Sequence, residues 1–255
     1  MTGESEPLLE GTLISHLLEL RTRLMRAFLA VVLVFIPFAF YSNQLFEWLS
    51  HPLLAQLPAN SMLISTSITA PFTTPLKLSF VAALVVAMPY VLYELWAFVA
   101  PGLYRHEKNF AVPLLVSAVI LFYVGVAFAY YVVFPMIFGF FVNTTPHGVQ
   151  MMADITMYVQ FVLVLLVSFG VAFEVPVAVV LLVLMGLVPL EKLTRIRGYV
   201  LIAVFIIAAI LTPPDAISQT VMAVPMYLLY EGGILFARLV IRSRTKREES
   251  TGGSP

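Results

Sequence analysis

Six long runs of apolar residues constrain the fold of this chain more than any other feature of its sequence. They cover approximately residues 24–41, 75–95, 112–134, 158–187, 199–211 and 217–237. A helix that crosses the hydrocarbon core of a bilayer needs about 20 mostly apolar residues. Membrane-spanning strands would instead alternate apolar and polar residues, and these runs do not. We therefore expect an all-α integral membrane protein with six transmembrane helices.

The composition excludes several other classes of protein. With 61% hydrophobic and 11% charged residues, the chain cannot cover a soluble surface with polar groups. Its net charge of zero argues against nucleic-acid binding. It has no cysteine and no phosphate-binding loop or nucleophile elbow, and the HExxH-like start at His106 lacks its second histidine. We expect a binding and transport protein without metal or cofactor, and not an enzyme.

The basic residues predict the topology. All but one of the 14 lysines and arginines lie before or at the start of the first run, between the second and third, between the fourth and fifth, or after the sixth. Because such residues mark the cytoplasmic side, both termini are expected in the cytoplasm. The N-terminus does not resemble a cleaved signal. We expect one membrane domain over residues 12–242, between disordered tails at 1–11 and 243–255.

Helix lengths and prolines predict an irregular shape. The fifth run spans roughly 20 Å before Pro213 and Pro214, whereas the hydrocarbon core is about 30 Å thick. We expect short fifth and sixth helices, beside which the bilayer thins. Prolines within other runs should bend their helices into a curved scaffold. Residues 46–49 suit a short helix at the membrane interface.

Three polar residues in or beside the apolar runs need an explanation. Glu174 lies in the fourth run without a basic neighbour, where an ionised group costs about 2.5 kcal/mol or more. It either bonds to a polar side chain of a neighbouring helix or docks a polar group of a ligand or partner. Gln160 is more simply explained by a bond between helices. Asp215 opens the sixth run, where capping the helix is the simpler role.

Two segments on the predicted cytoplasmic side combine acidic and aromatic residues. Residues 15–24 predict an amphipathic helix in which His16, Glu19 and Arg23 share one face, with a favourable Glu19–Arg23 pair. Residues 94–107 contain aromatic residues and end at Glu107. The acidic groups either offset nearby basic residues or form a guanidinium site, since arginine pairs with carboxylates and stacks on rings.

Four segments in order, together with Glu107, resemble the TatC family, the large polytopic subunit of the twin-arginine protein translocase. They are SHLLELRTRL (15–24), WAFVAPGLY (96–104), FGVAFEVP (169–176) and TPPDAISQ (212–219). The resemblance implies a cup-like receptor in the prokaryotic cytoplasmic membrane. Such a receptor binds twin-arginine signal peptides of folded precursor proteins and assembles single-span TatA- and TatB-type subunits for transport driven by the proton-motive force. Self-association is also expected.

The resemblance also implies residue roles. Signal-peptide binding would involve Glu19, Leu20, Arg21, Phe98 and Glu107. Contact with a partner or signal inside the membrane would involve Glu174 and Gln160, and the outer turn comprises Pro213, Pro214, Asp215 and Gln219. Glu94 departs from the family, in which an uncharged polar residue is common at this position. It would either join the arginine site or pair with a nearby basic residue.

Two alternatives remain open at this stage. A six-span secondary transporter of small molecules or ions would have paired polar groups at the membrane midplane and broken helices. Glu174 alone, without an evident inverted repeat, supports that alternative poorly. A structural assembly scaffold without a cargo site would leave Glu19 and Glu107 dispensable.

Overall fold

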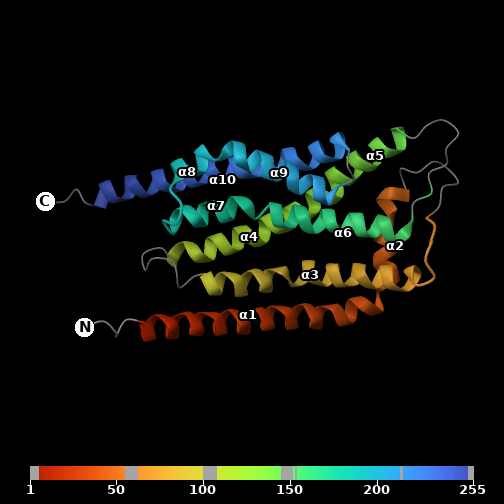
Figure 1. The fold of residues 1–255 in the computed structure, drawn as a ribbon, viewed down its shortest axis with the longest axis horizontal. Helices are drawn as coiled ribbons and strands as arrows, with labels where there is room; N and C mark the ends of the chain where they lie inside the picture. Colours follow the sequence, from red (N-terminus) through yellow and green to blue (C-terminus); the bar gives the residue numbers. More distant parts are fainter. Residues whose placement is uncertain are drawn as a thin grey trace.

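The described chain is almost entirely helical, as the apolar runs predict (Figure 1). The computed structural model describes the backbone of residues 6–54, 63–99, 108–144, 152, 154–212 and 215–251. Its helices are α1 (Glu6–Phe40), α2 (Ser42–Leu54), α3 (Ala70–Val99), α4 (Lys108–Phe128), the π-helical turn η3 (Ala129–Val133), α5 (Phe134–Thr144), α6 (Ile155–Ala172), α7 (Val175–Leu184), α8 (Leu190–Arg195), α9 (Arg197–Leu211) and α10 (Ala216–Thr251).

Five helical segments of the described chain are long and apolar enough to cross a membrane. They are Ser15–Phe40, Ala70–Val99, Val112–Thr144, Ile155–Leu184 and Ala216–Arg242, and the shorter apolar helix α9 supplies the sixth segment. The sequence prediction of six apolar helices is therefore confirmed. The third extends further than the run ending at residue 134, because η3 and α5 continue it to Thr144.

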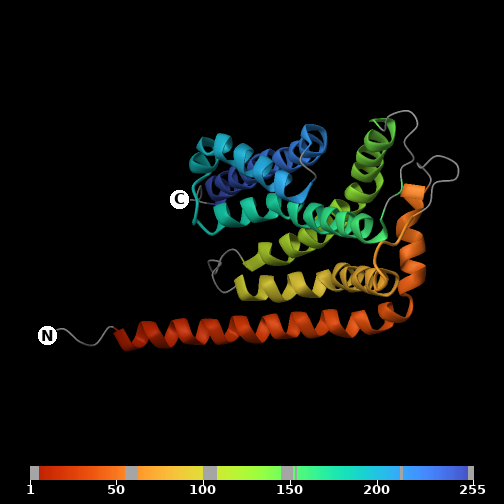
Figure 2. The ribbon, with the colours of Figure 1, turned by 45° about the vertical axis from the view of Figure 1, so that its right-hand side comes forward.

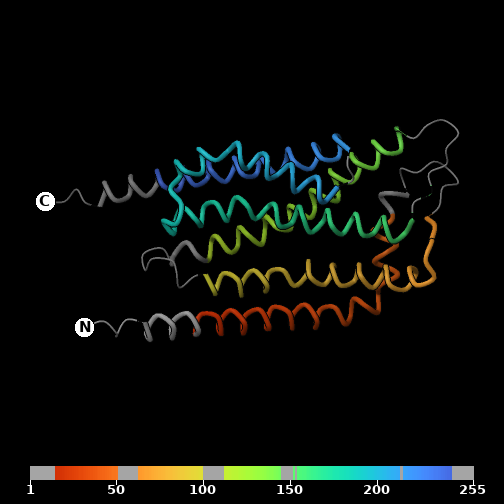
Figure 3. Tube along the Cα trace, viewed as in Figure 1, coloured from red at the N-terminus to blue at the C-terminus, as the bar shows by residue number. Residues whose placement is uncertain are grey.

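The long helices lie lengthwise with both ends of the chain on the same side (Figure 1). We call the end where α1 begins and α10 finishes the terminal end, and the opposite end the α2 end. Helices α1 and α3 pack side by side, α4 packs on α6, and α7 packs on α10. Figure 2 shows α2 standing across the ends of these helices, and Figure 3 shows α6 and α7 following one path.

Tyrosine hydroxyl groups fasten α2 in this crosswise position. The Tyr130 hydroxyl donates to the carbonyl of Trp48 at 3.3 Å, and the Tyr158 hydroxyl donates to that of Leu49 at 2.8 Å. The rings of Trp48 and Tyr130 are also stacked, with centroids 4.9 Å apart. The short helix expected around residues 46–49 is therefore present as part of α2.

One predicted helix length is wrong. Helix α10 has 36 residues, so the sixth helix is not short. Residues 238–251 contain neither proline nor glycine, and the helix continues past its apolar part. Helix also covers residues 6–11 and 243–251 of the two tails expected to be disordered. The fifth helix, α9, is short as predicted, with 15 residues.

The turn between α9 and α10 follows from the residues there. Thr212, which precedes Pro213, has the extended angles φ −112° and ψ 159°. A residue before proline is pushed away from helical angles, so α9 stops. Helix α10 begins after Asp215, whose Oδ1 accepts the backbone N–H of Ser218 at 2.7 Å. The predicted capping role of Asp215 is thus confirmed.

Small residues allow close packing between the helices. A Cβ on Gly125 of α4 would lie 2.5 Å from the carbonyl oxygen of Phe169 in α6. A Cβ on Gly233 of α10 would lie 2.9 Å from the Cα of Pro176 in α7. Such contacts are typical of helix packing in membranes, where backbones approach closely at small residues. They fix α4, α6, α7 and α10 around the cavity described below.

Candidate functional site

A row of polar and aromatic side chains lies between α1 and α3. On α1, the row contains three residues on one helix face at spacings of three and four. On α3, it contains three residues at spacings of four. We call these six residues the polar strip: His16, Glu19 and Arg23 from α1, and Tyr90, Glu94 and Phe98 from α3. The strip exists because helical periodicity aligns each row and the two helices pack side by side.

Arg23 is the centre of the polar strip. Its Nε and Nη2 donate to Oε1 of Glu19 at 2.9 and 2.7 Å. Its Nη1 donates to Oε2 of Glu94 at 3.2 Å, and the Tyr90 hydroxyl donates to the other oxygen of Glu94 at 2.9 Å. The pair predicted between Glu19 and Arg23 is confirmed. Glu94, whose role the sequence left open, pairs with the same arginine.

The polar strip is open on one side and closed on the other. The Glu94 side chain is 4% exposed, that of Arg23 is 22% exposed and that of Glu19 is 38% exposed. Toward the terminal end, the rings of His16 and Phe98 are stacked with centroids 4.3 Å apart. The strip thus offers an accessible carboxylate beside aromatic rings. This combination suits a guanidinium group.

Only some of the predicted arginine-binding residues meet in this strip. Glu19 and Phe98 belong to it, and Leu20 is half-buried beside it in sequence. Arg21 is exposed and lines a shallow pocket of about 490 Å³ on another face of α1, together with Arg26. Glu107 lies outside the described residues. Arg21 is therefore not brought together with Glu19.

Glu174 lies at the break between α6 and α7, two residues before Pro176. Its Oε1 is buried and has no hydrogen-bond partner among the described residues. The bond to a neighbouring helix that the sequence allowed is thus not formed within this part of the chain. Gln160 of α6 is exposed, and the described residues give its side chain no partner either. Within the described part of the chain, the bond between helices that the sequence favoured for Gln160 is therefore not formed.

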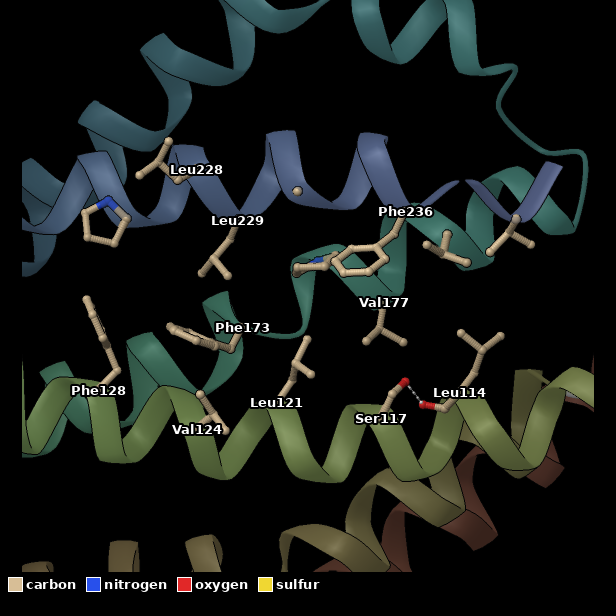
Figure 4. A pocket seen from close by; sticks show the side chains of 15 residues that line it. Leu114, Ser117, Leu121, Val124, Phe128, Phe173, Val177, Leu228, Leu229 and Phe236 are labelled. Atoms are coloured by element: carbon tan, nitrogen blue, oxygen red, sulfur yellow. Dashed lines mark hydrogen bonds between the residues drawn. The ribbon is translucent and has the colours of Figure 1, made fainter. Parts of the chain in front are cut away.

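An apolar cavity of about 740 Å³ lies among α4, α7 and α10 (Figure 4). Phe173 and Pro176, the neighbours of Glu174, belong to its wall. Ser117 is the one lining residue with a polar side chain, and its hydroxyl donates to the carbonyl of Leu114 at 2.8 Å. An occupant would therefore meet an apolar wall. We call this space the apolar cavity.

The sequence did not reveal the apolar cavity. Its lining residues come from three helices and read in the sequence only as ordinary membrane-spanning residues. The hollow depends on where α4 and α10 lie relative to α7. Figure 4 shows Leu121, Phe173, Val177, Leu229 and Phe236 reaching into it from different helices.

The turn between α9 and α10 contains a second group of polar atoms without partners among the described residues. Asp215 Oδ1 caps α10, but its Oδ2 and the hydroxyl of Ser218 are buried and have no partner among the described residues. The backbone N–H of Gln219 donates to the carbonyl of Asp215 at 3.2 Å. Pro213 and Pro214 lie outside the described residues. The turn is arranged chiefly to start α10.

Asp154 has a structural role that the sequence did not single out. Its Oδ2 accepts the backbone N–H and the hydroxyl of Thr66 at 3.0 and 2.7 Å. Its Oδ1 accepts the N–H groups of Thr156 and Met157, which begin α6. The hydrogen bonds from Thr66, more than the others, lower the pKa of Asp154 from 3.8 to about 2. Asp154 thus joins α6 to the chain before α3.

No group of metal-ligating side chains occurs in the described residues.

Several known proteins resemble this chain in sequence and structure. Residues 15–225 match the family model described as TatC, Sec-independent protein translocase protein. Sec-independent protein translocase protein TatC of Escherichia coli K12 is 49% identical over 237 residues, which are 93% of this chain and 92% of that protein. Its counterpart in Azotobacter chroococcum mcd 1 is 47% identical over 254 residues, covering 100% and 99%. A crystal structure of the twin arginine translocase receptor TatC aligns with a TM-score of 0.80 at 36% identity, covering 88% of this chain and 98% of that chain.

Proposed function

Because this chain belongs to the TatC family, we propose that its polar strip receives the paired arginines of a twin-arginine signal peptide. The family comprises Sec-independent protein translocase proteins, which are not enzymes, and the several apolar helices of this chain agree with it. Membership of this family sets aside the alternative of a small-molecule or ion transporter. The solved relative is named as a receptor, and a receptor needs a site for its cargo.

One observation carries the proposal: the polar strip holds two carboxylates but one arginine. Glu19 is its exposed carboxylate, and both of its hydrogen bonds with Arg23 end on the same oxygen, Oε1. A second guanidinium would neutralise the remaining negative charge. Because hydrogen bonds to charged groups contribute about 1.5–3 kcal/mol, one such contact changes affinity by roughly 10- to 150-fold. Glu107 is proposed as the second acidic group on the grounds of family resemblance.

The apolar cavity is the proposed place for the apolar segment of the same signal peptide. Its wall along α4 runs from Leu114 to Phe128, a rise of roughly 21 Å in a helix. That length suits a short apolar helix. Because Leu114 lies near the start of α4 at the terminal end, the cavity extends from that end into the membrane-spanning part.

Glu174 and Gln160 are proposed to contact polar groups of partner helices or of the signal. Both side chains lack partners among the described residues, although they lie in a membrane-spanning segment. Single-span TatA- and TatB-type subunits are the proposed partners, together with further copies of this chain. In the complex, the proton-motive force would drive transport of folded precursors.

We further propose that the terminal end faces the cytoplasm of a prokaryotic cell. The basic residues of α8 and α10, Lys192, Arg195, Arg238 and Arg242, support this orientation by the positive-inside rule. Helix α9 has 15 residues, roughly 22 Å, and is shorter than the hydrocarbon core of about 30 Å. The lipid bilayer is therefore expected to thin beside α9.

Peptide binding tests the proposed function. The protein in lipid nanodiscs is titrated with a fluorescent peptide that has two adjacent arginines before an apolar segment, and with the same peptide carrying two lysines. Lysine keeps the charge but lacks the bidentate fork, so the arginine peptide should bind more tightly. Glu19→Gln should reduce that preference by about tenfold or more. Glu191→Gln, which changes an exposed carboxylate of α8 at the same end, is the matched control and should leave it unchanged. Equal binding of both peptides to the unaltered protein would refute the proposal.

A further inference from the structure

The carboxylate proposed to receive a signal arginine already holds an arginine of this chain. Arg23 makes two hydrogen bonds with Glu19, at 2.9 and 2.7 Å. These are the contacts that an incoming guanidinium would make. A signal arginine must therefore share Glu19 with Arg23 or displace Arg23 from it.

Glu94 provides a second position for the Arg23 side chain. Its Oε2 already accepts Nη1 of Arg23 at 3.2 Å, while the Tyr90 hydroxyl holds its other oxygen at 2.9 Å. The Glu94 side chain is 4% exposed, so a bulky signal peptide has little access to it. Arg23 can thus remain paired with Glu94 when it leaves Glu19.

We propose that Arg23 is a built-in competitor for Glu19, and that Glu94 takes over Arg23 when a signal arginine binds. This inference rests on the proposed function of Glu19. The transfer keeps the number of ion pairs at two: Arg23 pairs with both Glu19 and Glu94 before it, whereas after it Glu19 pairs with the signal and Arg23 pairs with Glu94 alone. A lysine cannot make the two hydrogen bonds that the Arg23 guanidinium makes with Glu19, so a lysine does not displace Arg23. Arg23 thereby sets the selectivity of the site.

The charges of the strip support this exchange. Two carboxylates and one guanidinium leave one negative charge for an incoming arginine. If position 94 were uncharged, Glu19 and Arg23 would form a neutral pair, and an incoming arginine would have to expel a guanidinium with no carboxylate to receive it. The other arginines of this part of α1, Arg21 and Arg26, line the shallow pocket and make no ion pair among the described residues, although the charge of Arg26 reaches Tyr90 of the strip.

A double-mutant cycle tests the inference with the arginine and lysine peptides in nanodiscs. Glu94→Gln should weaken binding of the arginine peptide by about tenfold, the effect expected for one charge-assisted contact. Arg23→Gln should tighten it, because the competitor is gone. In the double variant, Glu94→Gln should have little further effect, because there is no Arg23 left to receive. Arg23→Lys keeps the charge and should bind the lysine peptide relatively better, which reduces selectivity.

The possible outcomes separate the inference from the proposed function. If arginine preference depends on Glu19 but Glu94→Gln weakens binding equally with and without Arg23, the exchange is refuted and the function stands. If Arg23→Gln and Arg23→Lys both weaken arginine binding, Arg23 supports the site and does not compete for it, and the exchange is again refuted. If the unaltered protein does not prefer arginine, both proposals fail. Unfolding temperatures of all variants identify any loss of binding that results from misfolding.

Discussion

Among the membrane-spanning segments that contain an acidic residue, α3 and the segment made of α6 and α7 treat it in opposite ways. In the polar strip, Glu94 accepts hydrogen bonds from Arg23 and Tyr90 on both of its oxygens. Between Phe173 and Pro176, which line the apolar cavity, Glu174 has a buried Oε1 without a partner among the described residues. Both carboxylate oxygens of Glu94 thus have hydrogen-bond donors within the chain, whereas Oε1 of Glu174 has none among the described residues.

The difference agrees with the ligand proposed for each region. A buried polar atom without a partner costs about 1–3 kcal/mol, so Glu174 lowers stability unless something outside the described chain meets it. Glu94 accepts hydrogen bonds from Arg23 and Tyr90, and in the proposed exchange it acts on the exposed Glu19 through Arg23. The polar strip is therefore suited to exchanging one guanidinium for another. The apolar cavity is suited to receiving an apolar segment that brings a polar group with it.

The largest effects should come from substitutions at two adjacent glycines of α10. One substitution should disturb helix packing, and the other should block peptide binding. Gly233→Leu places a side chain against the Cα of Pro176, 2.9 Å from the Cβ position, and backbone cannot move aside easily. It should cost about 3 kcal/mol and detach α7 from α10. Gly232 lines the apolar cavity, and its Cβ position has nothing within 4 Å. Gly232→Leu should fold normally and fill the cavity.

Thermal unfolding and peptide binding in nanodiscs distinguish the two variants. We expect Gly233→Leu to lower the unfolding temperature, and Gly232→Leu to keep it while weakening binding of the peptide's apolar segment. Gly232→Ala, which adds one methyl group at the same position, is the matched control. Peptide binding that Gly232→Leu leaves intact would show that the apolar cavity is not the binding place.

A smaller effect on the unfolding temperature should distinguish Glu94 from Glu174 directly. Glu94→Gln removes a charge that Arg23 uses, and it should lower the unfolding temperature by roughly 3–10 °C. Glu174→Gln removes a charge that nothing in the described chain uses, and it should change the temperature by less than about 2 °C. Both measurements use the isolated protein in nanodiscs. Equal losses for the two variants would mean that Glu174 has an internal partner and would end the contrast between the regions.

The smallest effect on the unfolding temperature should come from Asp154, an acidic residue at the α2 end. Its hydrogen bonds, chiefly those from Thr66, lower its pKa from 3.8 to about 2, so folding favours its charged form. Its contribution to stability is present above a pH of about 4 and is lost as pH falls toward about 2. The unfolding temperature should therefore drop over that range, and Asp154→Asn should flatten the drop. An unchanged pH profile in Asp154→Asn would assign the drop to other groups.

The sequence predicted the positions of the helices better than it predicted the contacts between them. The apolar runs, the cap at Asp215 and the Glu19–Arg23 pair follow from spacing along one helix, which the sequence displays directly. The ion pair of Arg23 with Glu94 joins residues 71 positions apart, and it needs the packing of α1 on α3. The apolar cavity was missed for the same reason. The length of α10 was misjudged because apolarity defined the run, whereas helix continues in polar residues that contain no breaker.

The central claim is that the polar strip binds the arginines and the apolar cavity binds the apolar segment. The most direct measurement is the affinity of the arginine and lysine peptides for the unaltered protein, Glu19→Gln, Gly232→Leu and the double variant. We predict that Glu19→Gln removes the arginine preference and that Gly232→Leu weakens both peptides equally while preserving it. The two losses should add in the double variant, because the regions are separate. If Gly232→Leu abolishes the arginine preference, or Glu19→Gln leaves it intact, the division between the two regions is contradicted.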